Sequence, residues 1–206
     1  MADSSLLEEM RFLKDPLSPR ISIEAHTDRL YIRSYLEKDF DESSFLYSDK
    51  ELTQFFDHGE PRKKNEIYDY LEERGCRYFN QGVPFGIFSL FLKETNQFVG
   101  QIDLVPTENP GEVEIGWIIR KEFHHQGLCT ESVLEFLMPF INKIAQMGYT
   151  SNGTTVNRVI ATAHPKNIPS NKIIQKAGLA LYQTKLRYDG KPRNWYFLEL
   201  KKGDQR

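Results

Sequence analysis

VEIGWIIRKEFHHQGLCTESVLEF, residues 113–136, runs from a strand-like apolar segment through a glycine turn into a helix. Its first seven residues are rich in the branched and aromatic side chains that favour strands. Gly127 permits backbone conformations closed to other residues, and Thr130 and Glu131 suit the first turn of a helix. Backbone N–H groups in such a turn lack intrahelical partners and lie at the positive end of the helix dipole. The pattern predicts a phosphate site, although an ordinary strand-to-helix connection has the same appearance.

A second strand and a second helix follow at residues 158–163 and 166–177. Asn167 is in position to cap the helix, and Gly178 is a typical terminating residue. Ser170 therefore lies near a helix N-terminus. Its hydroxyl either donates to an anionic or sulfur leaving group or only caps the helix.

The two segments together resemble the GCN5-related N-acetyltransferase superfamily, whose acyl-CoA loop reads Gln/Arg-x-x-Gly-x-Gly/Ala. The six positions in this chain are His124-His125-Gln126-Gly127-Leu128-Cys129. Within the superfamily the chain is most similar to the ribosomal-protein N-terminal acetyltransferase subgroup. The similar segments are TDRLYIRSYLEKDFD, FVGQIDL, EIGW, CTESV and NIPSNKIIQKAGL. His124 and Cys129 depart from the family pattern. The change at His124 puts little in doubt about acyl-CoA binding, since backbone donors do not depend on side-chain identity. Cys129 is larger than alanine and can tighten the loop.

The order of strands and helices predicts an α+β domain. The resemblance implies a mixed, mostly antiparallel sheet of seven strands covered by helices. In that sheet the fourth and fifth strands, residues 113–119 and 158–163, are parallel and splay apart. Residues 28–206 are assigned to this single N-acetyltransferase domain. Residues 1–27 are assigned to an N-terminal extension, with an amphipathic helix predicted from its Ser5-x-x-Glu8 capping pattern.

The resemblance also implies acetyl-CoA as co-substrate, bound in the cleft between the splayed strands. Its pantetheine amides would pair with the backbone of one strand, as an added strand does. Its pyrophosphate would sit on the amides of the glycine loop, with the second helix near the pantetheine arm and the sulfur. The residues expected to bind acetyl-CoA are Trp117, Ile118, Ile119, His124, His125, Gln126, Gly127, Leu128, Cys129, Thr130, Asn167 and Ser170.

Acetyl transfer to an amine needs a group that accepts a proton, a donor that steadies the oxyanion, and an acid that protonates the thiolate. Glu114 is the candidate base, acting directly or through water, unless it is only an ion-paired strand residue. Ser170 is the candidate donor to the thiolate, and Tyr182 is a second candidate acid. The amide of Ile118 or Trp117 is the expected oxyanion donor.

Several other classes of function are disfavoured. A net charge of −2 supplies no basic field for nucleic acid, and no apolar run is long enough to span a membrane. Two isolated cysteines, Cys76 and Cys129, favour a reducing, cytoplasmic location. No metal is expected, because the adjacent His124 and His125 rarely converge on one ion. A reactive Cys129 at the helix N-terminus was weighed against a packed small residue, which is the favoured interpretation.

The sequence therefore predicts an N-acetyltransferase that carries acetyl from acetyl-CoA to a primary amine by direct attack in a ternary complex. The alternative is a catalytically silent module that binds acyl-CoA or another protein. The acceptor, a protein N-terminus or a small amine, is left open, as is the choice between monomer and homodimer. The loop of residues 56–61 and the hairpin near Tyr188 and Trp195 are expected to form the acceptor mouth.

Overall fold

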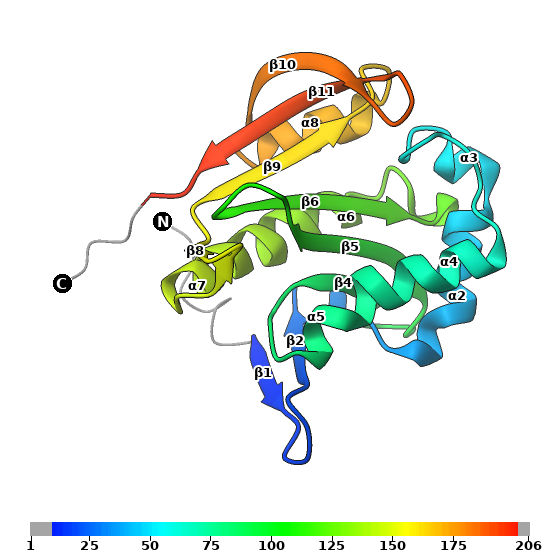
Figure 1. Cartoon of the computed structure of the whole chain (residues 1–206). Helices are drawn as coiled ribbons and strands as arrows, with labels where there is room; N and C mark the ends of the chain where they lie inside the picture. Colours follow the sequence, from blue (N-terminus) through cyan, green and yellow to red (C-terminus); the bar gives the residue numbers. More distant parts are fainter. Residues whose placement is uncertain (1–9, 202–206) are drawn as a thin grey trace.

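A nine-stranded sheet runs through the protein in the computed structural model, which describes residues 10–201 (Figure 1). The strand order is β1-β2-β3-β4-β5-β6-β9-β11-β10, and a separate hairpin pairs β7 with β8. Neighbouring strands are antiparallel except β6 and β9, which are parallel. The strands are β1 (Arg11–Lys14), β2 (Ile21–His26), β3 (Leu30–Ser34), β4 (Gly86–Leu92), β5 (Phe98–Pro106), β6 (Glu112–Ile119), β7 (Thr150–Ser151), β8 (Thr154–Thr155), β9 (Arg158–Ala163), β10 (Ala180–Arg187) and β11 (Lys191–Glu199).

Helices connect the strands and lie on both faces of the sheet. The α-helices are α2 (Phe40–Ser48), α3 (Lys50–Thr53), α4 (Lys64–Leu71), α5 (Arg77–Asn80), α6 (Leu128–Glu131), α7 (Met138–Gln146) and α8 (Ile168–Lys176). Two 3-10 turns, η1 (Glu37–Asp39) and η3 (Lys121–Phe123), and two π-helical turns, η2 (Glu72–Cys76) and η4 (Ser132–Leu137), join them. No helix in the described part of the chain is long and apolar enough to cross a membrane.

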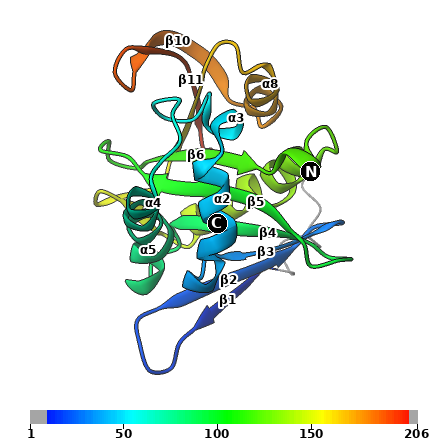
Figure 2. The same cartoon turned by 90° about the vertical axis from the view of Figure 1, so that its right-hand side faces the viewer.

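Two apolar clusters lie on opposite faces of the sheet, one under α7 and the other under α2 and α4. Figure 2 shows α2 and α4 lying over one side of the sheet. In the larger cluster the rings of Phe88, Phe136 and Phe140 are fully buried, with centroids 5.2 to 5.3 Å apart. The smaller cluster contains Leu46 and Ile67. Burial of each such side chain stabilises the fold by about 1.5–3 kcal/mol. Because both faces are covered, β5 is buried along nearly its whole length.

The N-terminal segment differs from its prediction. The predicted helix is wrong for Arg11–Lys14, which is strand β1; the rest of that helix, up to residue 9, lies outside the described residues. Strand β2 buries alternate residues Ile21, Ile23 and Ala25, a period-2 pattern that fits a strand. The turn between the strands is closed by the backbone N–H of Asp15, 3.0 Å from the Arg20 carbonyl. These two strands extend the sheet from the seven expected strands to nine.

The expected fold class is confirmed, including the position of the splay. Strands β6 and β9 pair from Glu112 to Ile115 on one side and from Arg158 to Ala161 on the other, and then separate. Beyond Ile115, strand β6 keeps only its antiparallel neighbour β5. One edge of its backbone is therefore left facing a gap between two halves of the sheet.

Candidate active site

A cleft of about 590 Å³ opens where β6 and β9 separate. Two groups of residues line it. The donor end is formed by the free end of β6, the turn before α6 and the start of α8, and its lining residues include Trp117, Ile118, Ile119, His124, His125, Gly127, Leu128, Cys129, Thr130, Asn167 and Ser170. The acceptor end comprises Phe56, Asp57, Arg74, Asp103, Glu114, Tyr188 and Arg193. Of the residues expected to bind acetyl-CoA, only Gln126 does not line the cleft.

The turn before α6 presents backbone amides to the donor end. The first intrahelical bond runs from the Glu131 N–H to the Gly127 carbonyl at 2.9 Å, so the amides of residues 128–130 are first-turn donors without helical partners. Gly127 has a φ of 80°, a conformation that side chains disfavour. A Cβ at Gly127 would lie 3.5 Å from the Arg29 Nη2 atom, on the side of the turn that Arg29 contacts. This cradle fits a pyrophosphate.

A buried carboxylate holds this turn against the sheet. Glu131 accepts from the Thr27 hydroxyl at 2.6 Å, from the Arg29 backbone N–H at 2.9 Å and from Arg29 Nε at 2.7 Å. Arg29 Nη1 also donates to the Gln126 carbonyl at 2.9 Å. We call Thr27, Arg29 and Glu131 the bracket. It explains the position of Gln126, whose main chain is held from behind while its side-chain Nε2 donates to the Glu122 carbonyl.

The free edge of β6 is partly used by the protein itself. A ring nitrogen of His124 lies 2.9 Å from the Ile119 carbonyl, so this departure from the family pattern ties the turn to the strand. Of the three residues expected to pair with the pantetheine arm, Ile119 therefore has its carbonyl engaged. Trp117 and Ile118 lie beyond the last pair formed with β9 and face the cleft.

The start of α8 supplies the hydroxyl at the donor end. The Asn167 side chain accepts from the Ser170 N–H at 3.2 Å, which is the predicted helix cap. The Ser170 hydroxyl accepts from the Trp117 indole N–H at 3.2 Å, which links the two splayed halves of the sheet. Ser170 therefore lines the cleft with its hydroxyl proton directed by this contact. Lys172 and Lys176 of the same helix add positive charge that sequence reasoning missed.

Glu114 lies in the cleft as an ion-paired residue. Arg187 of β10 donates to both of its carboxylate oxygens, at 2.6 and 3.0 Å, and the Thr162 hydroxyl lies 3.4 Å from Oε1. The Glu114 side chain is 13% exposed. Both carboxylate oxygens accept from the guanidinium of Arg187, so the geometry matches the alternative weighed from the sequence, an ion-paired strand residue.

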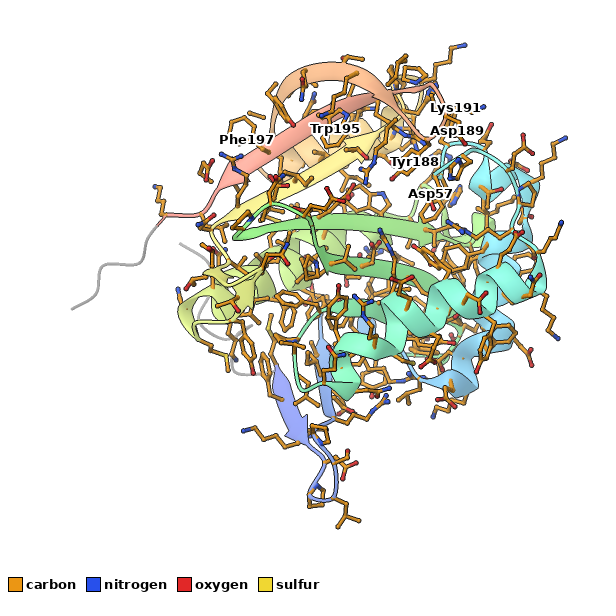
Figure 3. All side chains as sticks on the ribbon, viewed as in Figure 1. Asp57, Tyr188, Asp189, Lys191, Trp195 and Phe197 are labelled. Carbon is orange, nitrogen blue, oxygen red and sulfur yellow. The ribbon has the colours of Figure 1, made fainter. Side chains whose placement is uncertain are left out.

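The loop of residues 56–61 meets the β10–β11 hairpin turn at the acceptor end, as the sequence predicted. Figure 3 shows Asp57 and Tyr188 close together there, and Arg193 Nη2 donates to the Asp57 carbonyl at 2.6 Å. His58 lies 2.9 Å from the Asp189 carboxylate. Trp195 is not part of this mouth; it sits farther along β11 under Lys185, whose Nζ is 3.9 Å from the ring centroid.

The structure removes two chemical candidates. Tyr182 packs edge-on against Phe197 and does not line the cleft, so its role as an acid is not supported. Burial raises the pKa of the Cys129 thiol, which opposes formation of the thiolate that a nucleophile requires. Within residues 10–201, no group of three or more His, Cys, Asp or Glu side chains is arranged to hold a metal ion.

Sequence reasoning missed the charged side chains of the acceptor end, Arg74, Asp103, Arg187 and Arg193. They come from segments far apart in the chain and follow no local motif. Only Asp103 carried a signal, since it is an acid within the mostly apolar strand β5. An acid at such a position requires either a partner or a function.

A sheet splayed beside a phosphate-binding helix start is the architecture of acyl-CoA-dependent acetyltransferases, and the fold and cleft define that class. The acetyltransferase (GNAT) domain family matches residues 29–180, which is more than half of the chain. The chain belongs to this family.

Individual relatives are also acetyltransferases, and they do not identify a subgroup of the family for this chain. YnaD, an uncharacterized N-acetyltransferase of Bacillus subtilis (strain 168), is 23% identical over 153 residues, covering 74% of this chain and 80% of YnaD. A GNAT-family acetyltransferase from Bacillus anthracis has a TM-score of 0.67 at 19% identity, covering 85% of this chain and 98% of that one. RimL, a ribosomal L7/L12 α-N-protein acetyltransferase solved with coenzyme A, has a TM-score of 0.65 at 15% identity, covering 84% and 96%. Since RimL lies among other acetyltransferases of similar score, the ribosomal-protein subgroup is not singled out.

Proposed function

We propose that this chain transfers acetyl from acetyl-CoA to a primary amine by direct attack in a ternary complex. The observation that carries the proposal is a pair of unpaired backbone surfaces on one cleft: the edge of β6 beyond Ile115 and the first-turn amides of residues 128–130. A free strand edge suits the amides of the pantetheine arm, and a helix N-terminus suits the pyrophosphate. Both surfaces line the cleft along which acetyl-CoA would extend, from its pyrophosphate at the start of α6 to its acetyl group where β6 and β9 separate.

Ser170 is proposed to donate a hydrogen bond to the departing thiolate. Its hydroxyl oxygen accepts from Trp117, which leaves its own proton free to point into the cleft. The amide of Trp117 or Ile118 is proposed to steady the oxyanion, because both residues belong to the free end of β6. These groups would act late in the reaction, when negative charge develops on oxygen and then on sulfur.

The acceptor is proposed to be a primary amine at a protein N-terminus or on a small molecule. The fold shared with RimL makes a peptide α-amine the first acceptor to test. An α-amino group with a pKa of about 7.7–8.0 also needs less help from a base than a lysine amine with a pKa of about 10.4. The test is a screen of isotopically labelled acetyl-CoA against peptides, polyamines and aminoglycosides. Calorimetry of acetyl-CoA alone provides the independent binding measurement.

The second candidate is a module that binds acyl-CoA without turnover. The ion pair between Glu114 and Arg187 favours it, because it occupies the acid expected to act as base. Acetyl-CoA binding with no labelled product from any amine class would support this module. Binding together with a labelled product would support the transferase. The absence of any heat with acetyl-CoA would contradict both.

A further inference from the structure

One buried acid at the acceptor end is left without a role by the proposed transferase. Asp103 of β5 is 8% exposed and lines the cleft. Its Oδ2 atom lies 3.5 Å from Arg74 Nη1, which is a long contact for an ion pair. Among residues 10–201, Arg74 is the side chain that donates a hydrogen bond to the Asp103 carboxylate. In contrast to Glu114, Asp103 therefore keeps one carboxylate oxygen that accepts no hydrogen bond from the described part of the chain.

The free oxygen of Asp103 points at the opening of the splay. Asp103 pairs with Gly116 across β5 and β6, and a Cβ built on Gly116 would lie 2.4 Å from Asp103 Oδ1. Gly116 is also the first residue of β6 beyond the last pair with β9. The absence of a side chain at this position therefore leaves the carboxylate uncovered where the cleft begins.

The surroundings of Asp103 keep its proton affinity high. Burial raises the pKa of Asp103 to about 7, with Arg74 opposing the rise and the nearby Glu114 and Asp57 adding to it. Burial raises the pKa of two nearby tyrosines, Tyr47 of α2 and Tyr70 of α4, and the Asp103 charge adds to the rise. A general base works best when its pKa lies near the operating pH.

We propose that Asp103 is the catalytic base, an inference that rests on the proposed amine acetylation. Its Oδ1 atom takes one proton from the ammonium group of the acceptor and later releases it to solvent. The freed nitrogen electron pair forms the new C–N bond with the thioester carbonyl carbon, and the C–S bond breaks with its electrons going to sulfur. The second nitrogen proton then passes to the sulfur, so the products are the acetylated amine, free coenzyme A and one proton.

The kinetic test compares Asp103→Asn with Glu114→Gln, using the intact chain and an acceptor verified for the wild type. Asp103→Asn is expected to lower kcat by about 10²–10⁴-fold, the usual contribution of a general base, while calorimetry finds unchanged acetyl-CoA affinity. Asp69→Asn, which removes an exposed acid on α4, is the matched control and is expected to leave kcat unchanged. A large loss in Glu114→Gln with little loss in Asp103→Asn would overturn the assignment.

The pH profile separates a base from a residue that only maintains structure. The wild-type kcat/KM should fall as the pH drops below about 7, because Asp103 becomes protonated. This limb should stay in place when an acceptor of different amine pKa is used. Arg74→Met should move it to higher pH, since loss of the cation raises the pKa of Asp103 further.

A direct titration keeps the assignment testable if no amine is turned over. Carbon-13 NMR of the Asp103 carboxyl, identified by its loss in Asp103→Asn, should show titration near neutral pH. Titration near the ordinary value of about 3.9 would overturn the assignment whatever the enzyme does. Neutral titration in a protein that binds acetyl-CoA but acetylates no amine would instead overturn the proposed function and with it the catalytic role.

Discussion

The two ends of the cleft present different kinds of chemical groups. The donor end presents main-chain groups: the free edge of β6 and the first-turn amides of α6. The acceptor end is built from five separate parts of the chain, with Arg187 on Glu114, Arg74 on Asp103 and Arg193 on the Asp57 carbonyl. Main-chain recognition tolerates changes in sequence, as His124 and Cys129 illustrate. A site built from side chains depends instead on the identity of each residue.

The largest expected effect is at the donor end. Gly127→Trp forces a side chain into a left-handed backbone position beside Arg29, which distorts the turn that orients the amides of residues 128–130. Acetyl-CoA affinity should fall at least about 100-fold by calorimetry, which corresponds to about 2.8 kcal/mol. The matched control is Gly148→Trp, which has the same φ of 80° and no atom within 4 Å of a built Cβ. Equal affinity in the two variants would contradict the donor-end assignment.

A smaller effect is expected where the two ends meet. Gly116→Ala places a methyl group against Asp103, and such overpacking costs about 1–3 kcal/mol in the free energy of unfolding. Chemical denaturation measures this cost. In the double variant Gly116→Ala, Asp103→Ala the clash is absent, so the losses should not add. Strict additivity would show that the two residues are not in contact.

The bracket provides a third test, because the charged side chain of Glu131 holds Arg29 against the turn of the donor end. Glu131→Gln removes the ion pair to Arg29 and weakens the bond to Thr27, so we expect a loss of about 1–2 kcal/mol in stability. Acetyl-CoA should also bind several-fold more weakly, since Arg29 would no longer fix the Gln126 carbonyl. Glu199→Gln, which breaks an exposed pair with Arg158, is the control and should cost less than about 0.5 kcal/mol.

The last test is a pH dependence of stability at Asp103. Its folded-state pKa of about 7 lies above the unfolded value of about 3.9, so the stability due to the bound proton is complete below pH 4. It is lost as the pH rises through 7. Asp103→Asn cannot ionise, and its Tm should match the wild type near pH 4 and exceed it at pH 8. A shift of 1 kcal/mol corresponds to about 2–4 °C in a chain of this size. A variant that is less stable than the wild type at pH 8 would contradict the raised pKa.

The part of the site that was predictable lies in contiguous segments. The strand, the glycine turn and the helix start at residues 113–131 are present as expected, and Asn167 caps α8 as expected. The N-terminal strands were missed, because four residues at β1 carry too short an apolar pattern to outweigh a helical capping motif upstream. The sequence favours Glu114 as the base because it places this acid on the strand beside the expected acyl group. The ion pair to Arg187 could not be predicted, because Arg187 lies 73 residues away.

By itself, the sequence determined the α+β class and the strand, glycine turn and helix start of residues 113–131, because local periodicity, glycine and helix-start residues act on their own neighbours. The splay between two particular strands was implied by the family resemblance and not by any local pattern, and the structure contains it. Only the tertiary structure decided that Glu114 accepts hydrogen bonds on both carboxylate oxygens, whereas Asp103 has a single long contact with Arg74. The burial and ion pairing of these acids depend on how β5, β6, η2 and β10 pack together. These elements are far apart in the sequence, so no single segment determines their contacts.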